Sequence, residues 1–197
     1  MPVFTQTVSG SNDREGTSAA NSFDGFTMGN EAGSVKYAGV RFTTVTIPAG
    51  STINSAAMSV NAQGVENGQP ATIHTRVFCE AADDPGAWDT TTHRIDTATA
   101  TTAFADWDPS AWGVGSTVTG PDFASAVQEV IDRGGWASGN AVAILVRDDG
   151  SSSNGLGYAL DNSARIAIDY TEGAGGGGAV GPGAYLAYYQ RIVAGVL

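Results

Sequence analysis

Cysteine and positive charge are both scarce in this sequence. Cys79 is the single cysteine in 197 residues, so the chain cannot form an internal disulfide bond. No reactive motif surrounds Cys79, and its place in an alternating run predicts a buried thiol. Nine Lys and Arg stand against 20 Asp and Glu, which gives a net charge of −11. Because phosphate binding needs clustered cations, naked nucleic acid is a poor partner.

Long hydrophobic runs and the motifs of common enzymes are also missing. No run of about 18 apolar residues occurs, so we expect no membrane span. Residues 1–6 have neither the basic nor the apolar region of a secretory signal, so we expect synthesis in a cytoplasm without a signal peptide. With only His74 and His93, and no G-x-S-x-G elbow, a nucleophilic triad is not expected. One cysteine and two distant histidines cannot make a closed zinc site either.

Small residues that favour turns and strands are abundant instead. The chain has 27 glycines and only 15% charged residues, a composition typical of short strands joined by tight turns. We therefore predict one all-β domain of two packed sheets. Residues 9–34 look like a long loop or two short strands, and residues 81–122 look irregular. Alternating apolar positions predict strands at 3–8, 35–45, 56–62, 71–80, 140–147 and 165–170.

One helix is predicted, over residues 122–133. Pro121 and Asp122 give a stop and a cap, and a Gly pair follows at 134–135. Gln128 and Glu129 fall on the polar side, and Trp136 is expected to fold back and seal one end of the sandwich. The apolar residues that recur at helical spacing are Phe123, Val127, Val130 and Ile131.

Several segments resemble DNRLRE-like domains. Residues 37–42 and 45–56 are similar to their Arg-containing strand, Ile-Pro-x-Gly turn and following Ile-x-x-Ala strand. Residues 127–141 look like their helix-to-strand signature, and residues 158–161 and 164–170 look like their closing strands. The resemblance covers residues 3–172 and implies a jelly-roll β-sandwich without a catalytic centre. Such sandwiches are similar to carbohydrate-binding modules and occur on exported proteins and phage virion proteins.

Three tryptophans are the candidate glycan-binding residues, because sugar faces stack on exposed aromatic rings. Trp88, Trp107 and Trp112 all lie in the irregular segment 81–122, and Trp107 stands between two aspartates. The alternative for each is a role in sealing the core.

Acidic residues offer two further readings. The pairs Asp83–Asp84, Asp106/Asp108 and Asp148–Asp149 could flank a glycosidic bond, but adjacent carboxylates on one loop usually cap turns or face solvent. We therefore do not expect an enzyme. No cofactor is expected apart from a structural calcium ion, for which flexible acidic loops could supply oxygen ligands although no D-x-D-x-D-G loop is present. Its candidate ligands are Asp13, Glu15, Asp148 and Asp149.

The C-terminal end differs from the rest. We divide the chain into a sandwich (1–172), a Gly-rich linker (173–183) and an apolar tail (184–197). The tail can form a helical stripe or a strand that augments another sheet. Docking on another subunit is favoured over packing on its own domain or contacting a membrane. Its docking residues are Tyr185, Leu186, Tyr189, Ile192, Val193, Val196 and Leu197.

The resemblance and the tail together lead to one expectation of function. We expect a non-enzymatic virion structural or adhesion protein, such as a capsid decoration or a tail-fibre component, at the virion surface. Its partners would be other virion subunits, further copies of itself, and a cell-surface glycan. The alternative is a free carbohydrate-binding module that acts at a bacterial cell surface.

Overall fold

Strands are the main regular secondary structure of the protein, whose structure is a computed structural model. It describes residues 2–7, 26–65, 72–89, 92–109, 113–153, 155–159 and 163–173. The predicted linker and tail, Asp13, Glu15 and Trp112 lie outside these residues, apart from Gly173. The strands are β1 (Val3–Thr7), β2 (Phe26–Glu31), β3 (Ser34–Lys36), β4 (Ala38–Phe42), β5 (Thr52–Val65), β6 (Thr75–Cys79), β7 (Ala105–Trp107), β8 (Thr117–Thr119), β9 (Val142–Asp148), β10 (Leu156–Ala159) and β11 (Arg165–Thr171).

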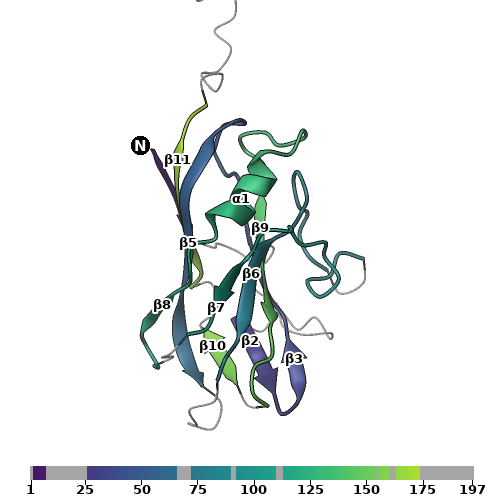
Figure 1. Cartoon of the computed structure of the whole chain (residues 1–197), viewed down its shortest axis with the longest axis vertical. Coiled ribbons are helices and arrows are strands. Elements are labelled where there is room, and N and C mark those ends of the chain that lie inside the picture. The colour runs from purple at the N-terminus through teal and green to yellow at the C-terminus, as the bar shows by residue number, and fades with distance from the viewer. Residues whose placement is uncertain are drawn as a thin grey trace, which may run out of the picture.

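The strands form two antiparallel sheets. The larger sheet has seven strands in the order β1–β11–β5–β10–β2–β3, with β8 also paired to β5. The smaller sheet has the order β4–β9–β6–β7. Strand β5 has fourteen residues and runs along much of the long axis in Figure 1, with the helix near the end that carries the N-terminus. This length lets β5 pair with β11 along Thr52–Ser59 and with β10 beyond Ala62.

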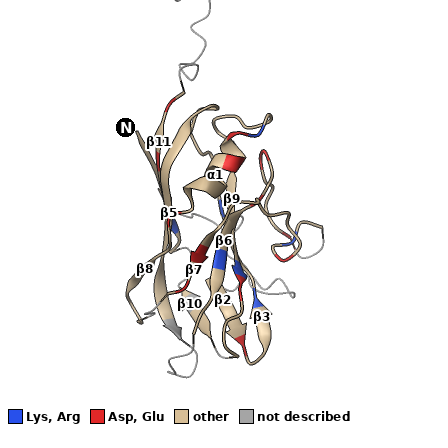
Figure 2. Cartoon of the chain, in the orientation of Figure 1, with Lys and Arg blue, Asp and Glu red and all other residues tan. Residues whose placement is uncertain are grey.

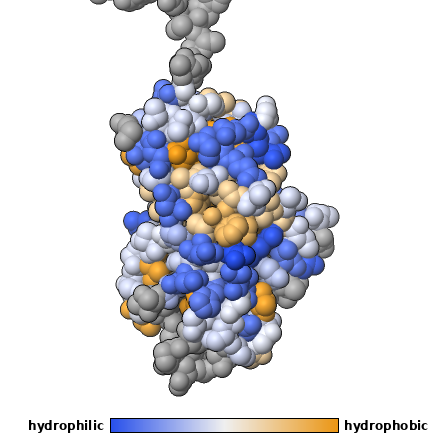
Figure 3. Space-filling view, viewed as in Figure 1, coloured by the Kyte–Doolittle hydropathy of each residue, from blue (hydrophilic) through white to orange (hydrophobic). Residues whose placement is uncertain are grey.

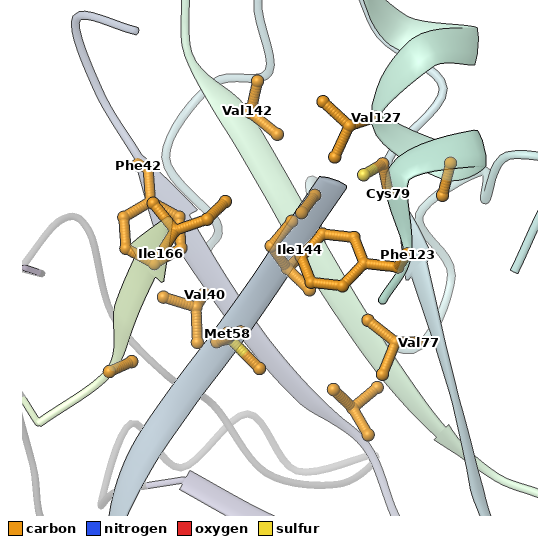
Figure 4. Packing of buried hydrophobic residues seen from close by; sticks show 14 of the residues in the cluster. Val40, Phe42, Met58, Val77, Cys79, Phe123, Val127, Val142, Ile144 and Ile166 are labelled. Carbon is orange, nitrogen blue, oxygen red and sulfur yellow. The ribbon is translucent and has the colours of Figure 1, made fainter. Parts of the chain in front are cut away.

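The core lies where side chains of both sheets and the helix meet. Figure 4 shows the Cys79 thiol beside Val127 of the helix, among apolar side chains that converge from several strands. Burial raises the pKa of this thiol far above its usual range, and the negative charge of Glu129 raises it further. The predicted buried thiol is confirmed, and the molecule is an all-β protein of β-sandwich-like architecture. Fully buried members include Val40, Phe42, Met58, Val77, Phe123, Ile144, Ile166 and Ile168.

The predicted strand at 35–45 was wrong in one respect, because it is two strands in different sheets. Strand β3 pairs with β2 in the larger sheet, whereas β4 pairs with β9 in the smaller sheet. Tyr37 lies between them and carries the chain from one sheet to the other. Alternation identifies a strand locally, but the choice of sheet depends on partners far away in the sequence.

The irregular segment 81–122 also holds two short strands, β7 and β8. Strand β10, which begins at Leu156, was likewise not among the predicted strands. Three or four residues are too few to display a period of two, which is why the sequence did not indicate them. Of the two readings for residues 9–34, short strands are correct where the structure describes the segment, as β2 and β3 show.

The predicted helix is confirmed as α1 (Ala124–Ile131), and its buried face contains Val127, Val130 and Ile131. Asp122 precedes it, and its carboxylate accepts hydrogen bonds from the backbone N–H groups of Ala124 (3.0 Å) and Ala56 (2.9 Å). The helix is therefore tied to β5 at its first turn. Within the described ranges, no helix is long and apolar enough to cross a membrane.

Candidate functional site

The outer face of the smaller sheet is largely covered by the segment that connects β6 to β7. Ala143 and Leu145 of β9 point away from the main core, yet they are only 1% and 0% exposed. Trp88, Ile95 and Ala98 of the connecting segment pack over them and form a second hydrophobic cluster. A strand buried on both faces is apolar at successive positions rather than at alternate ones, which explains the sequence of β9.

A buried carboxylate anchors this cover to the sheet. Glu80 is 7% exposed, and its carboxylate accepts a hydrogen bond from Trp88 Nε1 at 3.2 Å. His93 Nε2 lies 2.7 Å from the other oxygen of Glu80, and His93 Nδ1 lies 3.1 Å from the carbonyl oxygen of Ala87. Burial lowers the pKa of His93, but the contacts with Glu80 and Ala87 and the charges of Glu80 and Asp89 outweigh it, so the pKa is raised. The imidazolium form, which donates from both nitrogens, suits this position.

The predicted acidic pair Asp83–Asp84 also fastens the cover. Asp83 forms an ion pair with Arg133, which follows α1. The carboxylate of Asp84 accepts the backbone N–H of Ala141 at 2.8 Å, at the start of β9. Arg41 Nε donates to the carbonyl oxygen of Pro85 at 2.7 Å. These two carboxylates therefore hold a loop in place.

Beyond the cover, the sheet exposes an aromatic platform, defined here as Phe78, Phe104 and Arg76. The two rings lie 5.4 Å apart at an interplanar angle of 42°, and Phe104 is 44% exposed. The guanidinium carbon of Arg76 lies 4.6 Å from the centre of the Phe104 ring. Asp106 and Asp149 hold Arg76 at 3.1 and 2.8 Å.

The surroundings of the platform are charged. Figure 2 shows the basic stretch of β6 next to the acidic stretch of β7, which is the cross-strand pair of Arg76 and Asp106. Figure 3 shows apolar surface in the middle of this face, with hydrophilic residues above and below it. The platform therefore combines an apolar surface with hydrogen-bond donors and acceptors at its border.

The helix sets the position of Phe104. The carboxylate of Glu129 accepts hydrogen bonds from the backbone N–H groups of Thr102 and Ala103, each at 3.0 Å. These two residues come directly before Phe104, so α1 fixes the end of the segment that presents the ring. The sequence indicated only that Glu129 lies on the polar side of the helix. The two backbone N–H groups that donate to its carboxylate are 26 and 27 residues away in the sequence, so no local pattern indicates this contact.

The predicted glycan-binding tryptophans do not form this platform. Trp88 is 7% exposed and Trp107 is 3% exposed, and Trp107 packs against Phe26 with ring centres 6.1 Å apart. A Cβ atom on Gly39 would come within 2.7 Å of the Trp88 ring, so this indole packs directly against the backbone of β4. Both indoles fill hydrophobic clusters, as the alternative reading expected, and their faces are not open to a sugar. Trp112 lies outside the described residues.

The remaining acidic candidates act in turns and ion pairs. Asp148 accepts the backbone N–H groups of Gly150 and Ser151 at 3.2 Å each, and Asp149 pairs with Arg76. Asp108 lies 3.0 Å from His74 Nδ1. Across the described part of the chain, no three His, Cys, Asp or Glu side chains come together as a metal site would require. Asp13 and Glu15 lie outside that part.

An exposed ring bordered by charged groups can hold the apolar face of a polyhydroxylated ligand and bond its hydroxyl groups. The fold and this face define an all-β, β-sandwich-like protein with one exposed aromatic platform on its described surface. No protein-family model matches the chain, and no curated protein matches it.

Proposed function

We propose that the chain is a non-enzymatic structural and adhesion protein of a virus particle, in which a jelly-roll sandwich binds carbohydrate at a cell surface. A capsid decoration or a tail-fibre component is the role we favour. The observation that carries the adhesive part is the aromatic platform, where Phe104 is 44% exposed beside the guanidinium of Arg76.

The chemistry of the platform suits a sugar ring. The C–H face of a sugar packs on an aromatic ring, while its hydroxyl groups exchange hydrogen bonds with charged side chains around the ring. Arg76 supplies donors, and Asp106 and Asp149 supply acceptors within reach of the same ring. Arg76 is also held in place by both carboxylates, which lowers the cost of ordering it when a ligand binds.

The assembly part of the proposal rests on the sequence of the tail. The seven predicted docking residues in 184–197 follow a Gly-rich linker of eleven residues, 173–183. A coil of that length spans roughly 15–20 Å, which is enough to reach a neighbouring subunit. The proposed partners are therefore other virion subunits, including further copies of this chain.

A binding assay with platform variants tests the adhesive part. Phe104→Ala and Arg76→Gln are each expected to weaken binding to glycans on an array or to host cells roughly tenfold, because hot-spot aromatic and arginine side chains contribute on that scale. Val114→Ala is the matched control, since Val114 is 79% exposed and lies outside the platform. Unchanged binding by both platform variants would refute the assignment.

The alternative is a free carbohydrate-binding module that acts at a bacterial cell surface, and the same platform would serve it. The mass of the full chain in solution separates the two. A trimer or larger assembly supports the virion protein, and a monomer supports the free module.

A further inference from the structure

A second recess lies on the larger sheet, away from the aromatic platform. It is a groove of about 400 Å³ bordered by β1, β11, β5 and β8. We call it the Arg165 groove, after the charged side chain that borders it. Its position on a different sheet makes it independent of the platform and of the function proposed above.

The register of the strands explains the hollow. On the outer face, Thr7, Arg165 and Ser59 lie in one cross-strand row, which Thr119 of β8 extends. The neighbouring row on the same face is Thr5, Ala167 and Ala57. Because the two alanines are short, they leave an open floor beside the long side chain of Arg165. The border thus consists of one guanidinium group and several hydroxyl groups.

Arg165 differs from the other described basic residues. The charged groups of the other described Lys and Arg residues form ion pairs or hydrogen bonds. The guanidinium of Arg165 forms neither within the described structure. In a chain of net charge −11, an arginine without a carboxylate partner is notable. The next outward carboxylate along β11 is Asp169, which lies beyond Ala167 and within 3.5 Å of the Asn54 amide. Among the described residues, no carboxylate therefore competes with an outside anion for this guanidinium.

We propose that the Arg165 groove binds a carboxylate-bearing sugar, such as a uronic acid unit of a glycan. The planar guanidinium matches a carboxylate in a bidentate manner, and the hydroxyl groups of Thr7, Ser59 and Thr119 can exchange hydrogen bonds with sugar hydroxyls. A single cation in a strongly acidic protein favours a singly charged carboxylate over a phosphate or sulfate dianion.

An NMR titration of the isotope-labelled full chain tests the proposal. The probes are a disaccharide that contains glucuronic acid, the neutral disaccharide with glucose in its place, and sodium sulfate. The uronate is expected to shift backbone amides of β1, β5 and β11, and to bind at least about tenfold more tightly than the neutral sugar. Equal affinity for the two sugars, equal or tighter binding of sulfate, or shifts confined to the smaller sheet would each overturn it.

Variants locate the contact. Arg165→Gln is expected to weaken uronate binding roughly tenfold, because a charge-assisted bidentate contact is lost. Ala167→Leu is expected to weaken it too by filling the floor, without any change in charge. Lys36→Gln is the matched control, since it removes one positive charge from β3 at the opposite edge of the same sheet and should leave uronate binding in the groove unchanged. Because Arg165 is exposed, we expect Arg165→Gln to fold like the wild type, and circular dichroism checks this. Unchanged uronate binding by Arg165→Gln would contradict the groove proposal and leave the platform assignment untouched. Unchanged glycan binding by the platform variants would likewise contradict the platform assignment and leave the groove proposal untouched.

Discussion

Trp136 illustrates, at the scale of a residue, how one side chain closes an end of the sandwich. It is 5% exposed and belongs to the main hydrophobic cluster, as the sequence predicted. Its Nε1 donates to the carbonyl oxygen of Ile47 at 3.1 Å, so the indole joins the turn after α1 to the segment that precedes β5.

Trp136→Ala is expected to lower the free energy of unfolding by about 3–5 kcal/mol, because a large cavity remains in the core. Urea denaturation measures the loss. Trp136→Phe is the matched variant, since it keeps a ring but removes the hydrogen bond, and it should cost less. An unchanged melting temperature for Trp136→Ala would contradict a core role.

His93 gives the protein a pH-dependent contact. Its pKa is raised above the ordinary value of 6.5, so the folded state favours the protonated form. The stability that this contact contributes is fully present below about pH 6.5 and is lost as the pH rises through the folded-state pKa. Wild-type protein should therefore lose stability relative to His93→Gln as the pH rises from below 6.5 through the folded-state pKa.

Urea denaturation at a series of pH values measures this difference. His74→Gln is the control, because it removes the other histidine and leaves the pair of His93 and Glu80 intact. A parallel pH dependence of the wild type and His93→Gln would exclude His93 as the cause.

At the scale of elements, α1 does more than cover one end of the core. Through Glu129 it fixes residues 102–103, and through Gln128 it binds β5, whose Ile53 N–H donates to the side-chain oxygen at 2.7 Å. The helix thus links the long strand of one sheet to the segment that presents the Phe104 ring of the other.

Glu129→Ala is expected to destabilise the fold by about 1–2 kcal/mol, because two backbone N–H groups lose their acceptor. It should also weaken ligand binding at the platform by loosening Phe104. Ser125→Ala on the exposed side of the same helix is the control and should cost nothing, since alanine favours a helix. If both variants unfold at the same urea concentration, Glu129 does not hold the segment.

At the scale of the whole molecule, the last described residue, Gly173, lies close to the start of β5. Gly173 approaches the backbone of Gly50 so closely that a Cβ atom on it would lie 2.2 Å from the Gly50 carbonyl oxygen. Residues 174–197, which include the proposed docking tail, follow this contact.

Removal of residues 174–197 is expected to leave a folded monomer that no longer assembles, because the apolar docking face is gone. Analytical ultracentrifugation of the full and shortened chains measures the change. Ile192→Asp should act in the same direction, and Gln190→Ala should leave assembly intact. Assembly of the shortened chain with unchanged affinity would show that the tail is not the docking element.

The sequence by itself determined the all-β class, the position of the one described helix, and the burial of Cys79 and Trp136. Each depends on local periodicity or on composition, which a single segment displays. The alternation in residues 71–80 also puts Arg76 and Phe78 on one face of their strand, opposite Val77 and Cys79. It could not indicate that Phe104 lies next to them. That contact forms only because segment 81–104 folds back over the sheet, where hydrogen bonds to Glu80 and Glu129 keep it in place.

Only the tertiary structure decided which aromatic rings are exposed. Trp88 and Trp107 have the residue type of a sugar platform, but packing against Gly39 and Phe26 buries them. It also split residues 34–42 between two sheets and placed Arg165 next to a cross-strand row that contains two alanines, Ala167 and Ala57. Cross-strand partners are set by long-range pairing of segments up to about 160 residues apart, such as β1 with β11, and no local pattern records that pairing.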